Sequence, residues 1–413
     1  MKQKKVVITG MGVLSPNGNS VNEYWSALKS GTSGIAAISY FDTSDHRVTI
    51  AGELKNFDPN NFIEKKEIRK LDPFSIYALS AAQEAVDSSN LNLEDINLDR
   101  AGVVIATGIG GIRTLENEHN IITNKGPRRV SPLFVSKMIP NIAGGHLSMK
   151  FGFRGPSQTI ISACASSNDA IGIALRLIRY GDADIILTGG TEASITPLTI
   201  SGFANMKALS QNCTNPTKAS RPFDADRDGF VLSEGAGILM LESEEHALKR
   251  DAPILAELAG YGSTDDAFHI TQPAPEGLGA NKAMKIALLD ANLLPNDINY
   301  INAHGTSTPF NDKNESIAIS KVFKNNINKL KVSSTKSMTG HLLGAAGGIE
   351  AIATVKAIQN NIIPPTINYD KPDPNCNLYY TPNKYEKHQI DAALSNTFGF
   401  GGHNAVLCFK RYN

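Results

Sequence analysis

The spacing of apolar residues changes between positions 158 and 181, and the change predicts a strand, a turn and a helix. Residues 158–161 (QTII) end in a β-branched run that predicts a short buried strand. Over residues 169–179, apolar side chains occupy almost every helical face, so we expect a helix buried all round. The connecting residues, SACASS, are small, and Cys164 stands among them.

The same order of patterns occurs twice along the chain, which predicts duplication of one α/β unit. The paired segments are 4–18 with 252–266, 100–108 with 299–308, 159–178 with 334–358, and 182–193 with 390–404. The boundary falls near residues 244–252, so we expect an N-terminal half over 1–250 and a C-terminal half over 251–413. Alternating strands and helices favour layered α/β structure in one body, with the most apolar helices between two sheets.

Composition excludes several classes of protein. The chain has 413 residues, of which 41% are hydrophobic and 19% charged, so it can bury a large core and is not disordered. Lys plus Arg and Asp plus Glu are 40 each, and the formal net charge is zero. A nucleic-acid partner is therefore not expected, and a charged partner must meet a local patch.

Cysteine usage and the N-terminus indicate a cytoplasmic protein. Cys164, Cys213, Cys376 and Cys408 form no close pair and have no metal-ligand spacing, which argues against zinc and against a disulfide scaffold. The N-terminal lysines precede an apolar run, but glycines interrupt it, so we expect a first core strand and not a signal peptide. No apolar run approaches membrane-spanning length, and no membrane partner is expected.

Cys164 is a candidate nucleophile. Small neighbours would let a substrate approach the sulfur, and the unpaired N–H groups at a helix start favour thiolate over thiol. The alternative is a structural core cysteine, because free cysteine is among the most buried residue types.

The second half contains residues that could assist Cys164. His304 follows a short apolar strand in YINAHGTSTPFNDKNE (300–315), and Lys336 and His341 precede a buried helix in SSTKSMTGHLLGAAGGIE (333–350). Taken alone, each histidine could be a hydrogen-bonded loop residue and the lysine could be solvated. The repeat, however, would bring these loops to the end of the core where Cys164 lies.

These motifs resemble those of the β-ketoacyl-acyl-carrier-protein synthases of the elongating type II class, in the thiolase superfamily. The resemblance runs nearly end to end and also includes SRPFDADRDGFVLSEGAG (220–237) and SNTFGFGGHN (395–404). It implies a thiolase-like, five-layered αβαβα fold made of two duplicated α/β halves. It also implies condensation of an enzyme-bound acyl thioester with malonyl carrier protein.

The resemblance implies a role for each motif residue. Cys164 would carry the acyl group, and the backbone N–H groups of Cys164 and Phe400 would stabilise the oxyanion. His304 and His341 would each donate an N–H to the malonyl thioester oxygen, with a Lys336–Glu350 ion pair orienting His341. The remaining roles implied are gating of acyl entry by Phe400, contact with the phosphopantetheine arm by Thr306 and Thr308, the depth of the acyl pocket at Ile109, and structural support by Asp312 and Glu315. The alternative for Ile109 is an ordinary core residue, and the alternative for Glu350 is a capping or solvated glutamate.

The implied partner is an acidic acyl carrier protein, so the surface of this chain on which it docks should be basic. The docking positions that match are Lys66, Arg69, Lys70, Arg128, Arg129 and Lys207. Glu64 and Glu67 reduce the positive charge around Lys66, Arg69 and Lys70. The alternative to a docking surface is a solvated basic face. No metal, nucleotide or flavin motif is present in the sequence; no cofactor is expected, because the phosphopantetheine belongs to the partner. The expected assembly is a homodimer, with a heterodimer as the alternative.

Three departures from the family pattern leave the acyl specificity open. His403 stands where threonine is usual, Asn311 stands where glycine is usual, and residues 166–169 (SSND) are unusually polar. Polyene or polyketide assembly therefore stays an alternative to fatty-acid elongation. In that case the protein could be the active subunit of a heterodimer with a chain-length-factor-like chain. Other rivals are a thiolase acting on coenzyme A thioesters, a chain-length factor itself, and a carrier-binding module without chemistry.

Overall fold

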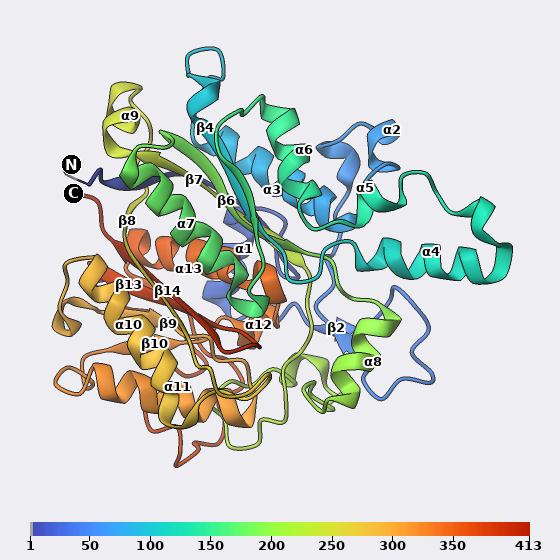
Figure 1. Cartoon of the computed structure of the whole chain (residues 1–413). Coiled ribbons are helices and arrows are strands. Elements are labelled where there is room, and N and C mark those ends of the chain that lie inside the picture. The colour runs from blue at the N-terminus through green and yellow to red at the C-terminus, as the bar shows by residue number, and fades with distance from the viewer. Residues whose placement is uncertain (1–2) are drawn as a thin grey trace.

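The computed structural model describes residues 3–413, in which ten strands form one mixed sheet (Figure 1). The strand order is β10-β9-β13-β14-β8-β1-β7-β6-β4-β5. In chain order the strands are β1 (Val6–Leu14), β4 (Ala101–Ala106), β5 (Ser157–Ile160), β6 (Ile185–Glu192), β7 (Gly235–Ser243), β8 (Ala256–Asp265), β9 (Tyr300–Asn302), β10 (Lys331–Ser333), β13 (Ala392–Phe398) and β14 (His403–Lys410). The short strands β2 (Ala36–Ala37) with β3 (Ile50–Ala51), and β11 (Ile362–Ile363) with β12 (Glu386–Lys387), form two separate pairs.

The two halves of the sheet have the same topology. In the first, β5, β4 and β6 are parallel, and β7 and β1 add antiparallel pairs. In the second, β10, β9 and β13 are parallel, and β14 and β8 add antiparallel pairs. The halves join where Val7 pairs with Glu257 and Ile8 with Ala256. The repeated segments therefore occupy equivalent places, and the predicted duplication is confirmed.

Helices cover both outer faces and fill the middle. The helices of these layers are α3 (Pro73–Ser88), α6 (Ile142–Phe151), α7 (Ser166–Tyr180), α10 (Leu278–Asp290), α11 (Pro309–Val322) and α13 (Ala346–Asn360). One core joins α7 and α13 to inward-facing strand residues of both halves, such as Val104. Alternate strand residues, such as Val103, face α3 and α6, and those of the second half face α10 and α11. These five layers confirm the predicted fold.

The remaining helices flank these layers, and one of them, Lys336–Thr339, is buried. They are α1 (Val21–Ser30), α2 (Lys65–Ile68), α4 (Ile112–Lys125), α5 (Phe134–Met138), α8 (Pro197–Asn205), α9 (Glu244–Lys249) and α12 (Lys336–Thr339). Figure 1 shows α4 extending away from the sheet. Within residues 3–413, no helix combines the length and apolar character needed to cross a membrane.

Two details of the predicted strand–turn–helix unit are wrong. The strand is β5, but it forms the edge of the sheet, where Ser157 and Gln158 are exposed rather than buried. Ile161 lies beyond the strand and is 54% exposed. The helix is buried along most of its length, but Arg176 and Tyr180 are exposed. Apolar spacing shows which residues prefer burial, but it does not show which strand lacks a second neighbour.

Candidate active site

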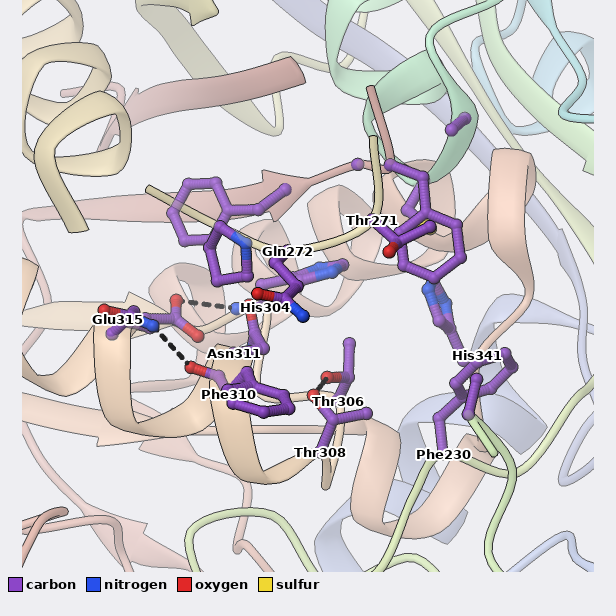
Figure 2. Close-up of a pocket in the computed structure, with 18 of the residues that line it drawn as sticks. Phe230, Thr271, Gln272, His304, Thr306, Thr308, Phe310, Asn311, Glu315 and His341 are labelled. Atoms are coloured by element: carbon purple, nitrogen blue, oxygen red, sulfur yellow. Dashed lines mark hydrogen bonds between the residues drawn. The ribbon is translucent and has the colours of Figure 1, made fainter. Parts of the chain in front are cut away.

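A cavity of about 390 Å³ opens between the two halves, and most predicted site residues line it. Figure 2 shows His304 and His341 facing it from different loops. The other predicted site residues in its wall are Cys164, Phe400, Thr306, Thr308, Ile109 and Lys207. Sequence motifs more than 200 residues apart therefore meet in one place.

Cys164 lies in a tight turn, Ala163–Ala165, between β5 and α7. Ala163 has a φ of +51°, a left-handed conformation that lets the chain turn sharply before the helix. Burial raises the pKa of the Cys164 thiol to about 11, although Lys336 and the backbone N–H of Phe400 favour the thiolate. The expected help from the helix start is thus outweighed, and the free enzyme holds a thiol at neutral pH.

The two histidines lie beside Cys164 as neutral rings. One ring nitrogen of each histidine and the Cys164 sulfur lie within 4.8 Å of one another. Burial lowers the pKa of both rings well below the usual range, and Lys336 lowers it further. The Leu343 N–H donates to Nδ1 of His341 at 3.3 Å, so the proton of this ring is on Nε2. That Nε2 is buried and has no hydrogen-bond partner in the described chain.

Lys336 fixes His304 and not His341. Its ammonium donates to Nδ1 of His304 at 3.3 Å and to the buried carboxylate of Glu350. His304 therefore also presents a protonated Nε2. Burial raises the pKa of Glu350 to about 7, against the stabilising charge of Lys336. The ion pair expected from the resemblance to orient His341 thus contacts the His304 ring directly, and Lys336 acts on His341 through its charge.

Glu315 holds the backbone on which His304 is mounted. Its carboxylate accepts the N–H of His304 at 2.9 Å (Figure 2). It also accepts the N–H of Gly305 at 2.8 Å. Asn396, on β13, donates to the same carboxylate at 3.1 Å. Glu315 lies three residues after Asp312 on α11, and both side chains are buried. Their supporting position agrees with the structural role expected of them.

The other predicted site residues that line the cavity lie in the loops around this centre. The hydroxyl groups of Thr306 and Thr308 are 2.9 Å apart at the wall (Figure 2). Ile109, 36% exposed, also lines the cavity. Phe400 is in the turn between β13 and β14. A Cβ on its neighbour Gly399 would lie 2.6 Å from the carbonyl oxygen of Ser162, so only glycine lets this turn approach the cysteine turn.

Of the six predicted docking residues, Lys207 alone lines the cavity. Arg128 and Arg129 lie in the short helical turn Pro127–Arg129, beyond α4. Lys66 pairs with Glu64 at 2.7 Å and Lys70 with Glu67 at 2.9 Å, so their charge is largely neutralised locally. Helix α2 ends at Ile68, before Arg69. The single helical face expected for Lys66 and Arg69 is therefore only one turn long.

The departures from the family pattern fall in different environments. Asn311 lines the cavity, whereas His403 begins β14, with Nδ1 3.5 Å from the Asp265 carboxylate. The polar residues after Cys164 are structural: Ser167 donates to the carbonyl of Gly344, and Asn168 donates to the carbonyl of Ser395 at 3.0 Å. They link the N-terminal half to the C-terminal half.

Cys164, His304 and His341 are also the one group of three potential metal ligands in residues 3–413. A thiolate and two imidazoles would suit zinc. The Lys336 ammonium touching His304 would repel a cation, and the high pKa of Cys164 opposes ligation. The arrangement instead offers a nucleophilic sulfur and two neutral N–H donors, which is the equipment of a cysteine acyltransferase.

Comparison with known proteins identifies the family. Residues 3–247 match the model of the beta-ketoacyl synthase N-terminal domain, and residues 255–370 match that of the beta-ketoacyl synthase C-terminal domain. The chain belongs to the β-ketoacyl synthase family. It is 49% identical to 3-oxoacyl-[acyl-carrier-protein] synthase 2 of Synechocystis sp. over 412 residues, covering 100% of this chain and 99% of the relative. It is 51% identical to the protein of the same name from Staphylococcus aureus, with the same coverage.

Solved structures agree with this family. A ketosynthase of a type II polyketide synthase, in complex with its acyl-carrier protein and bound to the hexaketide, superposes with a TM-score of 0.92 at 37% identity. The ishigamide ketosynthase/chain length factor superposes with a TM-score of 0.93 at 35% identity. Each comparison covers 100% of both chains.

Proposed function

We propose that this protein elongates acyl chains by decarboxylative condensation with malonyl-acyl-carrier protein. The observation that carries the proposal is the clustering of the Cys164 sulfur and the two neutral histidines in one cavity. The full-length relatives named 3-oxoacyl-[acyl-carrier-protein] synthase 2 support the fatty-acid substrate class.

In the first step Cys164 takes the acyl group from its carrier. The sulfur forms a bond to the thioester carbon, the carbon–sulfur bond to phosphopantetheine breaks, and the thiol proton passes to the departing sulfur. The N–H groups of Cys164 and Phe400 both act on the sulfur in the free enzyme. They stabilise the oxyanion that develops on the thioester oxygen.

In the second step malonyl carrier protein loses carbon dioxide. The electron pair of the broken carbon–carbon bond becomes an enolate, whose oxygen accepts hydrogen bonds from Nε2 of His304 and of His341. Neutral donors suit this role, because they stabilise charge that appears only in the transition state. The enolate carbon then forms a bond to the acyl carbon, and the bond from that carbon to the Cys164 sulfur breaks. The sulfur leaves as a thiolate that takes up a proton from solvent, and a β-ketoacyl product two carbons longer is released.

Other residues hold this arrangement or bind the substrate. Lys336, paired with Glu350, fixes the tautomer of His304 and adds positive potential at the developing thiolate. Thr306 and Thr308 bind the phosphopantetheine arm, and Ile109 limits the depth of the acyl chain. Phe400 gates acyl entry on a turn whose Gly401 and Gly402 have positive φ angles.

The partner is an acyl carrier protein, and the docking surface combines Lys66, Arg69 and Lys70 with Arg128, Arg129 and Lys207. A solved relative in complex with its acyl-carrier protein supports this partner. Because Glu64 and Glu67 neutralise Lys66 and Lys70, the other basic residues contribute more of the attraction. Binding should weaken as salt increases.

We also propose that the protein is a cytoplasmic homodimer, and that each chain divides into an N-terminal and a C-terminal half at residue 250. The exposed edge strand β5 and the exposed side chains of Ile161 and Val135 support a second copy as the neighbour of this edge. A heterodimer with a chain-length-factor-like subunit is the alternative assembly. Sedimentation of the purified chain alone distinguishes the two.

Polyene or polyketide assembly is the second candidate function. It is favoured by the type II polyketide ketosynthase and the ishigamide ketosynthase/chain length factor among the structures that superpose on the chain. A thiolase is disfavoured, because Cys164 is the one cysteine among the described residues that line the cavity. A chain-length factor or a binding module would not need a complete Cys–His–His cluster.

The test is intact mass of the protein after incubation with a panel of acyl carrier proteins and then with malonyl carrier protein. We expect an acyl adduct on Cys164 that disappears as a product two carbons longer forms. The preferred chain length and unsaturation separate fatty-acid from polyene substrates. An adduct retained in Cys164→Ala, or elongation from acetyl-coenzyme A without malonyl carrier protein, would contradict the proposal.

A further inference from the structure

Arg227 is a buried arginine directly behind the cavity wall. The next three residues, Asp228, Gly229 and Phe230, line the cavity, but the Arg227 side chain points away from it and is 5% exposed. A buried guanidinium requires hydrogen bonds in several directions, so its partners reveal what it holds together.

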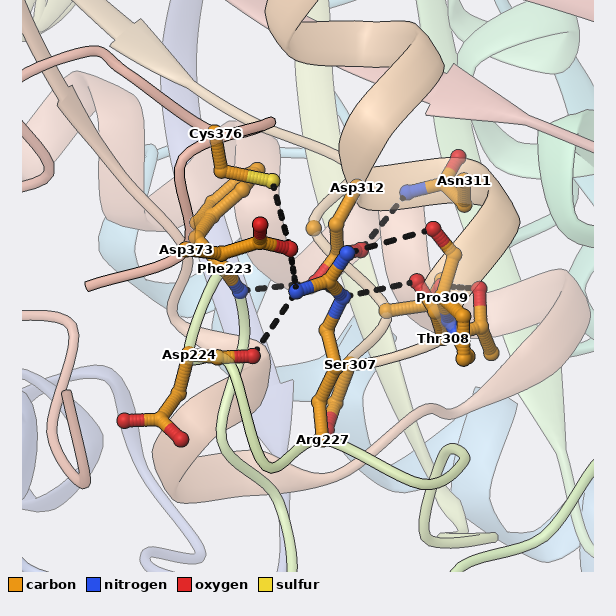
Figure 3. Close-up of polar contacts among 12 residues, drawn as sticks. Phe223, Asp224, Arg227, Ser307, Thr308, Pro309, Asn311, Asp312, Asp373 and Cys376 are labelled. Atoms are coloured by element: carbon orange, nitrogen blue, oxygen red, sulfur yellow. Dashed lines mark hydrogen bonds and ion pairs between the residues drawn. The ribbon is translucent and has the colours of Figure 1, made fainter. Parts of the chain in front are cut away.

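The guanidinium binds the first residues of α11 (Figure 3). Nε donates to the carbonyl of Thr308 and Nη2 to the carbonyl of Pro309, each at 3.2 Å. Nη1 donates to the Asp224 carbonyl at 2.8 Å and to the Asp373 carboxylate at 2.7 Å. The carboxylate of Asp312 lies 3.6 Å from Nε. Three chain segments therefore meet at one side chain.

These contacts join two parts of the cavity wall. On one side, Phe230 packs edge-on against the ring of His341, with centroids 5.3 Å apart. On the other, Thr308 places its hydroxyl 2.9 Å from that of Thr306. The N–H of Gly229 also donates to the carbonyl of Ser307 at 3.1 Å. The Thr308 hydroxyl is thus held at a fixed place relative to the catalytic ring.

We propose that Arg227 is a positioning residue for the phosphopantetheine arm. It holds the start of α11 so that the hydroxyls of Thr306 and Thr308 meet the arm, and it leaves the reactivity of the cysteine unchanged. This inference rests on the proposed function. Lysine cannot replace arginine here, because a single ammonium cannot reach acceptors in four directions.

The test compares two thioesters of the same acyl group. One is a pantetheine thioester, and the other is an S-ethyl thioester with no hydrogen-bonding group beyond the thioester. The rate constant for acylation of Cys164 is followed by intact mass for each. The ratio of the two rate constants measures how much the arm contributes to binding, independently of general losses of activity.

We expect Arg227→Lys to lower this ratio roughly tenfold, through loss of the arm contacts and not of the S-ethyl reaction. Thr308→Val should lower the ratio as well, and the double variant should lower it no further than Arg227→Lys alone. Alkylation of Cys164 by iodoacetamide should proceed at the wild-type rate in all three.

Arg250→Lys is the matched control. Arg250 also donates to two carbonyls, those of Ser89 and Asn90, and to a buried carboxylate, Glu242, but it lies outside the cavity. It should lose thermal stability and keep the wild-type ratio. Asp373→Asn, which removes one charged partner of Arg227, should lower the ratio about threefold and serves if Arg227→Lys does not fold.

A ratio unchanged in both Arg227→Lys and Asp373→Asn, or an equal loss with both thioesters, would make Arg227 a purely structural residue and overturn the inference. Failure of the wild-type protein to accept either thioester would overturn the proposed function instead.

Discussion

The two halves of the molecule build the same turn and use it differently. In each half a residue with positive φ, Ala163 at +51° and Leu343 at +46°, opens a short helical turn before a 15-residue helix. The next residue is Cys164 in the first half and Gly344 in the second. Cys164 faces the cavity, whereas a Cβ on Gly344 would lie 2.1 Å from the nitrogen of Gly108.

The difference shows that duplication supplies a backbone while the surroundings decide the chemistry. The Gly344 turn serves as a packing anchor: its N–H donates to the buried carboxylate of Glu192 at 3.1 Å, and its carbonyl accepts from Ser167. The second half contributes His341 from the residues just before that turn instead. Under the proposed mechanism, one half provides the nucleophile and the other provides the two histidine donors.

Removing the nucleophile should have the largest effect. Cys164→Ser should reduce condensation at least about 10⁴-fold, because an alcohol in this site is a far poorer nucleophile than a thiol. Product formation from acyl and malonyl carrier proteins measures the loss. A folded variant with a normal melting temperature is the control, and near-normal turnover would exclude Cys164 as the acyl carrier.

Removing a donor from the second half should separate the two steps. His304→Ala or His341→Ala should slow malonyl decarboxylation roughly 10²–10³-fold, the usual cost of one oxyanion donor, and slow acylation of Cys164 much less. Release of carbon dioxide and intact mass measure the two steps separately. Equal losses in both would mean that the histidines act on Cys164 and not on the enolate.

Adding a side chain at the equivalent turn position should damage stability. Gly344→Ala places a methyl group against the backbone of Gly108 and should cost about 3 kcal/mol of unfolding free energy. Gly145→Ala is the matched control, because its Cβ would meet nothing within 4 Å on α6. That change should be neutral or stabilise by about 0.5–1 kcal/mol. Denaturant unfolding measures the free energy of unfolding of both variants. Equal stability of the two variants would contradict the packing role of the Gly344 turn.

The pH dependence of cysteine alkylation should show how far burial controls the first turn. The raised pKa of Cys164, about 11, makes the thiolate fraction increase tenfold per pH unit throughout the range 7–10. Iodoacetamide alkylation, followed by peptide mass, should increase likewise without levelling. Cys164→Ala gives the background from the other cysteines. A plateau near pH 8.5–9 would show that the turn does favour the thiolate.

Most of the fold could be predicted because it depends on local patterns. The repeated segments marked equivalent strands and helices, and the small residues around Cys164 marked a turn at a helix start. The motifs found by resemblance were brought together in one cavity, including His304 and His341. Such features are encoded in a few consecutive residues.

What could not be predicted depends on neighbours distant in sequence. Lys336 reaches His304 rather than His341, because the side chain follows the geometry of α12 and not the order of the motifs. The exposure of β5 depends on strand order, and the pKa of Cys164 depends on total burial. Neither quantity appears in a local pattern.

The central position of β1 has a consequence for synthesis of the protein. This strand ends at Leu14, whereas its partners β7 and β8 begin at Gly235 and Ala256 and are made much later. At about 5–20 residues per second, a ribosome needs roughly 12–50 s to deliver them. During that time an apolar strand has no native partner, so we expect the nascent chain to need chaperones to prevent aggregation.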